Sequence, residues 1–170
     1  IFEEKDETFT CSIVLTSDEK FFVISTSDHI TTEDYFFPSD AKDIKPVLFK
    51  KRKKDVRYSI DSWKGYFYIH TNEDARDYKI LRCKIDSIDK LEVFIPSKKE
   101  TVVGSLDFLD DYIIRGEKTD AIPKLLIRNI KTNEEEEVKI SSEAIGVPGA
   151  SLIQKDTNTT KIRVHWESMA

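Results

Sequence analysis

The feature that most constrains the fold of this chain is an internal repeat of about 45 residues. The segments FFVIST, which starts at Phe21, and YFYIHT, which starts at Tyr66, share an apolar pattern at this spacing. The pattern continues one step further, and the aligned positions are Phe22, Phe67 and Tyr112, then Ile24, Ile69 and Ile114. A period of about 40–50 residues is typical of a β-propeller blade, whereas leucine-rich and helical repeats have other periods.

Each repeat contains short runs rich in Val, Ile, Phe and Tyr, separated by turn-forming segments such as SDEK, SWKG, TNED and KTNE. Such runs predict strands, and almost nothing in the chain has the spacing of a helix. We therefore expect an all-β fold, a partial β-propeller of about three and a half four-stranded antiparallel blades in one domain. The expected blades are residues 8–52, 53–97 and 98–142, followed by half a blade at residues 143–170. An immunoglobulin-like sandwich would not explain this regular repeat.

A serine recurs in the first expected strand of each repeat, at intervals of 46 or 47 residues. The four are Ser12, Ser59, Ser105 and Ser151. A residue type that returns at the same point of every repeat is better explained by packing than by catalysis, because inner strands converge near the axis of a propeller. We expect these serines on the innermost strand of successive blades, with their hydroxyls satisfied locally.

The polar segment TNEDARDY, residues 71–78, lies between two expected strands of the second blade. Asn72, Asp74 and Asp77 are residue types that bond their own backbone in turns. The same side chains could face a ligand, but no base, nucleophile or metal set accompanies them. We therefore interpret the segment as the turn between the second and third strands of this blade.

The sequence has no pattern of a catalytic, metal or cofactor site. The G-x-S-x-G turn of α/β-hydrolases does not occur among the five glycines. His29, His70 and His165 lack the spacing of a zinc or catalytic pair, and the acidic residues near them do not form a metal-binding loop. We expect no catalytic residue, no cofactor and no metal ligand in this chain.

Two runs of like charge are predicted to be solvated surface. KKRKK spans Lys50–Lys54 and could resemble a nucleic-acid or nuclear-localisation patch, but it follows an expected outer strand and lies in a chain of net charge −5. EEEE spans Glu134–Glu137 and is expected at the tip of a hairpin. The acidic balance argues against nucleic acid and anionic membranes as partners.

The two cysteines, Cys11 and Cys83, lie far apart in apolar strand patterns. We expect both to be buried free thiols in a reducing, cytoplasmic compartment. No apolar run approaches the roughly 20 residues that a membrane helix needs.

Three segments resemble the amino-terminal propeller of the prolyl oligopeptidase family of serine peptidases (S9), and within it the oligopeptidase B (protease II) branch. They are EEKDETF from Glu3 to Phe9, YFYIHTNEDARDYKILR from Tyr66 to Arg82, and IRVHWESMA from Ile162 to Ala170. The second is the most specific, because a strand that ends in Thr-Asn, an acidic-Ala turn and an aromatic-basic-aliphatic strand recur together in that propeller.

The resemblance implies a seven-bladed propeller that covers the active site of a carboxy-terminal α/β-hydrolase domain. The serine, aspartate and histidine of the triad would all belong to that hydrolase, so none is assigned to this chain. The propeller would admit short peptides and exclude folded proteins, and the oligopeptidase B branch would cleave after Arg or Lys. The competing hypothesis is a stand-alone propeller that scaffolds protein partners. A parent reading frame that continues into a G-x-S-x-G motif would distinguish the two.

The chain begins at Ile1 rather than at Met, and we expect it to be a piece of a longer protein. Apolar residues near its two ends, Phe9 and Ile13 on one side and Ile162 and Val164 on the other, would then lack their neighbouring blades. We expect the isolated segment to self-associate through these surfaces.

Overall fold

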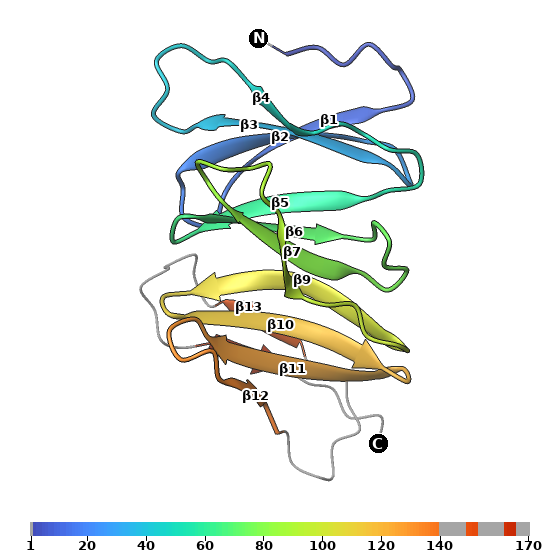
Figure 1. Cartoon of the computed structure of the whole chain (residues 1–170), viewed down its shortest axis with the longest axis vertical. Coiled ribbons are helices and arrows are strands. Elements are labelled where there is room, and N and C mark those ends of the chain that lie inside the picture. The colour runs from blue at the N-terminus through green and yellow to red at the C-terminus, as the bar shows by residue number, and fades with distance from the viewer. Residues whose placement is uncertain (1, 140–148, 153–161, 166–170) are drawn as a thin grey trace. The chain divides into compact units, whose positions relative to one another are not determined.

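The chain folds into antiparallel β-sheets, as a computed structural model shows (Figure 1). The structure describes residues 2–139, 149–152 and 162–165, the last two ranges by their backbone only. Strands are the only regular elements in these ranges. No helix in this described part of the chain has the length and apolarity needed to cross a membrane. The chain divides into two compact units, residues 1–96 and 97–170.

The first unit contains two four-stranded sheets in which strands follow one another in chain order. The first sheet consists of β1 (Thr10–Leu15), β2 (Phe21–Ser27), β3 (Thr32–Pro38) and β4 (Val47–Lys50). The second consists of β5 (Tyr58–Trp63), β6 (Tyr66–Thr71), β7 (Lys79–Lys84) and β8 (Glu92–Ile95). β-Branched and aromatic residues fill the central strands β2, β3 and β6, which suits the half-buried pleated surface of a sheet.

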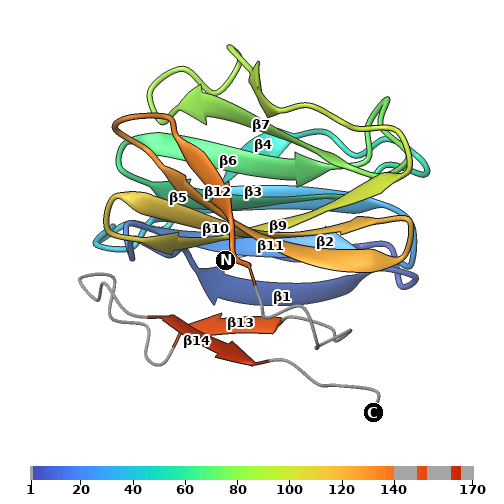
Figure 2. The same ribbon diagram turned by 90° about the horizontal axis from the view of Figure 1, so that it is seen from below.

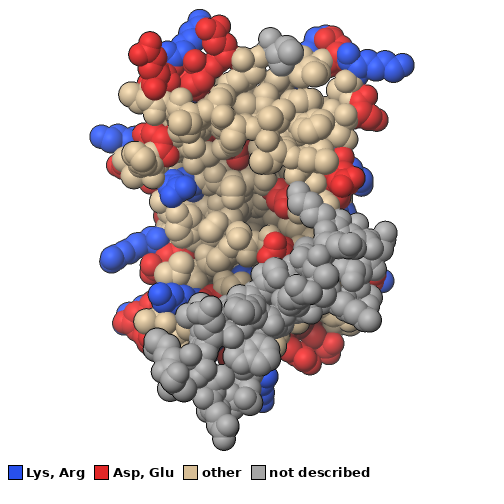
Figure 3. All heavy atoms as spheres, turned by 180° about the vertical axis from the view of Figure 1, so that it is seen from behind, with Lys and Arg blue, Asp and Glu red and all other residues tan. Residues whose placement is uncertain are grey.

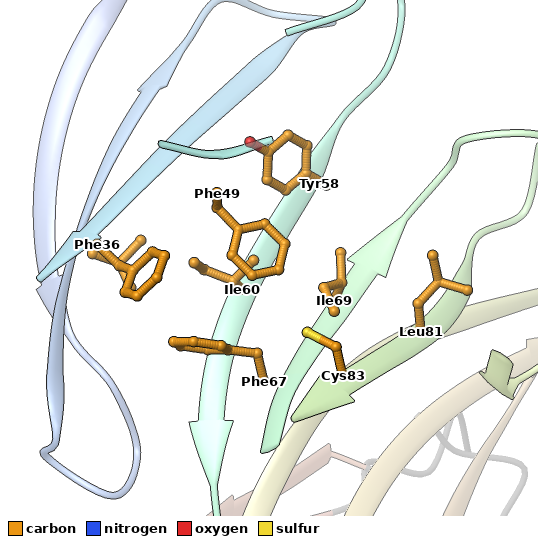
Figure 4. Packing of buried hydrophobic residues seen from close by; sticks show 9 residues of the cluster. Phe36, Phe49, Tyr58, Ile60, Phe67, Ile69, Leu81 and Cys83 are labelled. Carbon is orange, nitrogen blue, oxygen red and sulfur yellow. The ribbon is translucent and has the colours of Figure 1, made fainter. Parts of the chain in front are cut away.

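An aromatic cluster joins the two sheets of the first unit (Figure 4). Phe67 on β6 is completely buried, and its ring lies 4.9 Å from that of Phe36 on β3 and 5.6 Å from that of Phe49 on β4. Ile60 and Ile69 extend the cluster along the second sheet. The two sheets therefore share one core, as neighbouring propeller blades must, because a single sheet cannot bury its own apolar face.

The second unit contains a third four-stranded sheet and a two-stranded one. The third sheet consists of β9 (Thr101–Leu109), β10 (Tyr112–Thr119), β11 (Ile122–Asn129) and β12 (Glu135–Glu137). The hairpin pairs β13 (Gly149–Leu152) with β14 (Ile162–His165), both drawn in red in Figure 2. A bulge interrupts the pairing of β9 with β10 between Arg115 and Glu117. At this bulge a Cβ on Gly104 would lie 2.5 Å from the Gly116 carbonyl oxygen, so only glycine fits there.

The all-β prediction and the four-stranded antiparallel blades are confirmed. The repeat period is visible in the sheets themselves, because the aligned residues Phe22, Phe67 and Tyr112 stand at or next to the start of β2, β6 and β10. Each four-stranded sheet lies within one expected blade interval, and the hairpin lies within residues 143–170. The interval limits themselves stay predictions.

The prediction that both cysteines are buried is wrong for Cys11. Cys83 on β7 is 1% exposed within the aromatic cluster, whereas Cys11 is exposed. Cys11 lies on β1, which has a partner on one side only, and nearly every residue of that strand is exposed. An apolar strand pattern indicates a strand but does not reveal whether the strand stands at a sheet edge.

The difference between the two thiols predicts their reactivity. Burial raises the pKa of the Cys83 thiol to about 11, and Asp89 adds to the effect. Since the thiolate is the reactive species, we expect a disulfide reagent such as DTNB to modify one thiol per folded chain, and the second only after unfolding. Cys11→Ser should abolish the first reaction. Two equally fast reactions in the folded chain would contradict the burial of Cys83.

Candidate functional site

The recurring serines mark the first strand of every sheet. Ser12, Ser59, Ser105 and Ser151 lie on β1, β5, β9 and β13, each an edge strand of its sheet. The placement agrees with the prediction, but the expected close packing is not found. Ser12, Ser59 and Ser105 are exposed, while the side chain of Ser151 lies outside the described residues. In a propeller the edges of the sheets surround a central channel, so these hydroxyls are candidates for its lining.

A group of hydrogen bonds, the polar junction, connects the turn after β1 in the first sheet to β5 in the second sheet. Ser17, in the turn after β1, donates its backbone N–H and its hydroxyl to the two carboxylate oxygens of Asp61 on β5, at 2.7 Å and 2.6 Å. Ser62 donates its N–H to Asp61 at 2.8 Å and its hydroxyl to Asp18 in the same turn. Burial raises the pKa of Asp61, although these donors act to lower it.

Sequence reasoning missed this junction, although a signal was present. Asp61 follows the recurring Ser59 by two residues, and Asp107 follows Ser105 in the same way. An aspartate two positions after the serine therefore returns in two repeats. The Asp61 contact shows that the first of these aspartates binds the first turn of the preceding sheet.

The basic run is more structured than its sequence predicted. Arg52 forms ion pairs with Glu4 and with Glu33, the latter at 3.1 Å, and its backbone N–H donates to Glu33 at 2.7 Å. Its guanidinium also lies 4.1 Å from the centre of the Phe9 ring. Arg52 thereby ties the segment before β1 to the end of the first sheet. The exposed members of the run are Lys51, Lys53 and Lys54, as predicted.

The TNEDARDY segment is a turn between β6 and β7, as predicted, but its bonds differ from those expected. The Asn72 carbonyl accepts from the Ala75 N–H within the turn at 3.1 Å, but the Asn72 side chain bonds outside the turn. Its side chain accepts from the Arg57 N–H at 2.7 Å and donates to the Asp55 carbonyl at 3.2 Å. Glu73 forms an ion pair with Lys50, the first residue of the basic run. The turn therefore holds the connection between the first and second sheets, while Asp74 adopts a positive φ of 51°.

The acidic run is exposed along its whole length, as predicted, but most of it lies in a strand rather than at the tip of a hairpin. Glu135–Glu137 form strand β12, and Glu135 accepts two bonds of 3.0 Å from the guanidinium of Arg115. Arg115 is 1% exposed and donates further to Glu117 at 3.0 Å, which Lys98 also contacts. Arg115 and Glu117 are buried, and they form an ion network with the more exposed Glu135 and Lys98. A run of identical charges does not show in advance which member will pair with a buried cation.

The two histidine side chains that the structure describes have different surroundings. His29 is exposed, His70 stacks on Tyr78 at 4.5 Å between ring centres, and the side chain of His165 lies outside the described residues. Among the described side chains, no group of three or more His, Cys, Asp or Glu could hold a metal ion. On the face shown in Figure 3, acidic and basic side chains are interspersed.

Comparison with known proteins identifies the family. A family model described as the prolyl oligopeptidase N-terminal β-propeller domain matches residues 1–170. Protease 2 from Moraxella lacunata is 25% identical over 170 residues, which cover 99% of this chain and 24% of that protein. Dipeptidyl aminopeptidase BI from Pseudoxanthomonas mexicana is 26% identical over 172 residues, which cover 99% and 23%. The chain spans about a quarter of the length of these relatives.

Two solved structures share the fold. Oligopeptidase B from Trypanosoma brucei, in a closed form with covalently bound antipain, superposes with a TM-score of 0.85 at 16% identity, covering 99% of this chain and 25% of that one. Oligopeptidase B from Leishmania major gives a TM-score of 0.82 at 15% identity, covering 97% and 25%. With the family match over its full length, this chain belongs to the N-terminal β-propeller domain family of the prolyl oligopeptidases.

Proposed function

We propose that this chain is the substrate-gating propeller segment of a serine-type oligopeptidase that cleaves short peptides after Arg or Lys. The observation that carries the proposal is the family match over residues 1–170. The curated relative named Protease 2 and the solved structures named oligopeptidase B favour the basic specificity over cleavage after proline. The catalytic groups would belong to a carboxy-terminal α/β-hydrolase domain of the same parent chain.

The structure suggests how this segment contributes. Its edge strands β1 and β5 present the exposed hydroxyls of Ser12 and Ser59, and the Ser17–Asp61 contact holds these two edges together. Small polar side chains along two sheet edges that are held together suit a narrow channel. Such a channel would exclude bulky substrates without binding them tightly. The partners under this proposal are the hydrolase domain and short peptides, and the location is cytoplasmic, in keeping with the free thiols of Cys11 and Cys83.

The proposal is tested with the full-length parent protein and matched peptides that differ only in the residue before the cleaved bond. We expect kcat/KM for Arg and Lys peptides to exceed that for Pro peptides by about 100-fold or more, a difference of roughly 2.7 kcal/mol in transition-state stabilisation. Cleavage should stop when the same Arg-containing sequence is placed in a folded protein. The isolated 170-residue chain should show no hydrolysis above buffer.

Each outcome bears on one part of the proposal. A preference for Pro would overturn the basic specificity, and equal cleavage of the folded substrate would overturn the gating role. The alternative, a stand-alone propeller scaffold, predicts no hydrolase sequence in the parent reading frame. A downstream G-x-S-x-G motif in that frame would exclude it.

A further inference from the structure

The seam where the first two sheets meet contains a hydrogen-bonded contact of Tyr58, on β5, with β3 and β4. A bulge interrupts the pairing of β3 with β4 between Asp34 and Tyr35. The hydroxyl of Tyr58, from β5, enters this gap, accepts from the Asp34 N–H at 2.8 Å and donates to the Lys50 carbonyl at 2.5 Å. Figure 4 shows Tyr58 at the edge of the aromatic cluster, with its hydroxyl directed toward the first sheet.

The carboxyl group of Asp34 is buried beside this contact. The Ser25 hydroxyl and the Ile60 N–H act to lower its pKa. Asp34 is 1% exposed, and its Oδ1 atom is buried without a hydrogen-bond partner. A carboxylate in such a place costs several kcal/mol unless a cation compensates it, whereas a protonated carboxyl leaves no charge to compensate.

The charged and titratable groups around Asp34 form ion pairs or hydrogen bonds with other residues. Lys50, next to it on β4, forms an ion pair with Glu73, and Glu33 on the same strand pairs with Arg52. On β5, burial raises the pKa of Tyr58, which therefore keeps its proton, and Asp61 bonds Ser17. The cross-strand partner of Asp34 on β2 is the uncharged Ser25. On β6, His70 stacks on Tyr78.

We propose that Asp34 is a proton-operated latch between the first two sheets: the seam is closed while its carboxyl is protonated and loosens when the proton is lost. This inference concerns residues 1–96 and does not depend on the peptidase activity proposed above. It assigns a role to a buried acid that the proposed peptidase function does not use. The latch is intrinsic to the fold and needs no ligand.

The direction of the pH effect follows from linkage. Burial raises the pKa of Asp34 to about 7, although the bonds from Ser25 and Ile60 act to lower it. In an open seam the carboxyl is solvated and its pKa returns to about 3.9. Between these two values the closed state holds a proton that the open state has released, so each pH unit favours opening about tenfold. Below about pH 4 and above about pH 7 the effect levels off.

Hydrogen exchange measures the opening in the 170-residue chain or in its full-length parent. The readout is the protection factor of β5 amides, which is the intrinsic exchange rate divided by the observed rate and therefore removes the direct effect of pH on exchange. We expect it to fall about tenfold per pH unit between pH 5 and 7. Asp34→Asn keeps the shape and the acceptor oxygen but cannot ionise, so its β5 protection should stay nearly constant over this range.

Two variants separate Asp34 from other acids. Asp40→Asn removes an exposed carboxyl near the end of β3 and should reproduce the wild-type profile. Asp61→Asn tests the second buried acid that contacts β5. A wild-type profile without a slope would overturn the proposal, as would a slope that survives in Asp34→Asn and disappears in Asp61→Asn.

A direct titration covers the case in which Asp34→Asn does not fold. The side-chain carboxyl carbon of Asp34 in the wild-type chain should titrate near neutral pH by carbon-13 NMR, well above the range of exposed aspartates. A midpoint below pH 5 would overturn the proposal without any variant.

Discussion

Replacing Phe67 with alanine is expected to lower the free energy of unfolding of the first unit by about 3–5 kcal/mol. Phe67 is completely buried, and its ring contacts those of Phe21, Phe36 and Phe49 at centroid distances of 5.0, 4.9 and 5.6 Å. Alanine would leave a cavity where the two sheets meet and would remove three aromatic contacts at once. Urea unfolding followed by tryptophan fluorescence measures the loss, since Trp63 is buried in the same unit.

Two further variants calibrate this prediction. Phe67→Leu keeps most of the apolar volume and should cost clearly less than the alanine variant. Ile13→Ala removes a side chain that is 58% exposed on the edge strand β1 and should change stability by less than about 0.5 kcal/mol. Equal losses in Phe67→Ala and Ile13→Ala would mean that the shared aromatic core does not stabilise the first unit.

Replacing Arg115 with alanine should destabilise the second unit by about 3–5 kcal/mol, because it removes the buried cation that both carboxylates contact. Arg115 is 1% exposed and bonds Glu135 twice at 3.0 Å, while Glu117, 6% exposed, retains only Lys98. Thermal unfolding monitored by circular dichroism measures the change. The exposed ion pair of Lys131 with Asp111 offers a control, and Lys131→Ala should cost at most about 1 kcal/mol.

The Arg115 network also predicts a pH dependence. Burial acts to raise the pKa of Glu135, but the bonds and charge of Arg115 outweigh it and lower the pKa below its usual value. A lowered folded-state pKa contributes stability above the unfolded value, near 4.3, and this contribution is lost as the pH falls further. In Arg115→Ala the loss on acidification should shrink. An unchanged acid dependence would show that the contact with Arg115 does not stabilise the ionised form of Glu135.

The strands could be predicted because their signal is local and repeated. Alternation of apolar residues at a fixed period identified the runs that became β2, β6 and β10, and the polar segment 71–78 was correctly interpreted as a turn. Partners of the turn residues could not be predicted in the same way. Asn72 bonds backbone groups 15 and 17 residues earlier in the chain, and spacing alone does not reveal which earlier segment lies beside it.

Charged residues show the limit of sequence reasoning most clearly. Arg52 and Lys51 are adjacent in one basic run, yet Arg52 pairs with Glu33 while Lys51 is exposed. The same holds for Glu135 and Glu136 in the acidic run, since only alternate residues of a strand face the same side. The charge pattern predicted solvation for both runs, but it could not show which single member would form a close ion pair.

The strands that hold the recurring serines could be predicted, but the exposure of these serines could not. The serine period located Ser12 and Ser59 on first strands, whereas their exposure depends on both strands being sheet edges. The buried Asp34 had no sequence signal at all. Its burial depends on the bulge after it and on Tyr58, which stands 24 residues later.

The contacts between the first two sheets carry a consequence for how the chain emerges during synthesis. Ser17 meets Asp61 across 44 residues, so the first sheet can complete its own strand pairs before its neighbour exists. At about 5–20 residues per second, the ribosome needs roughly 2–9 seconds to add those residues. During this interval Phe36 and Val23 have no second sheet to cover them. Translation speed through residues 51–71 therefore sets how long a nascent chain presents this apolar face to other chains and to chaperones.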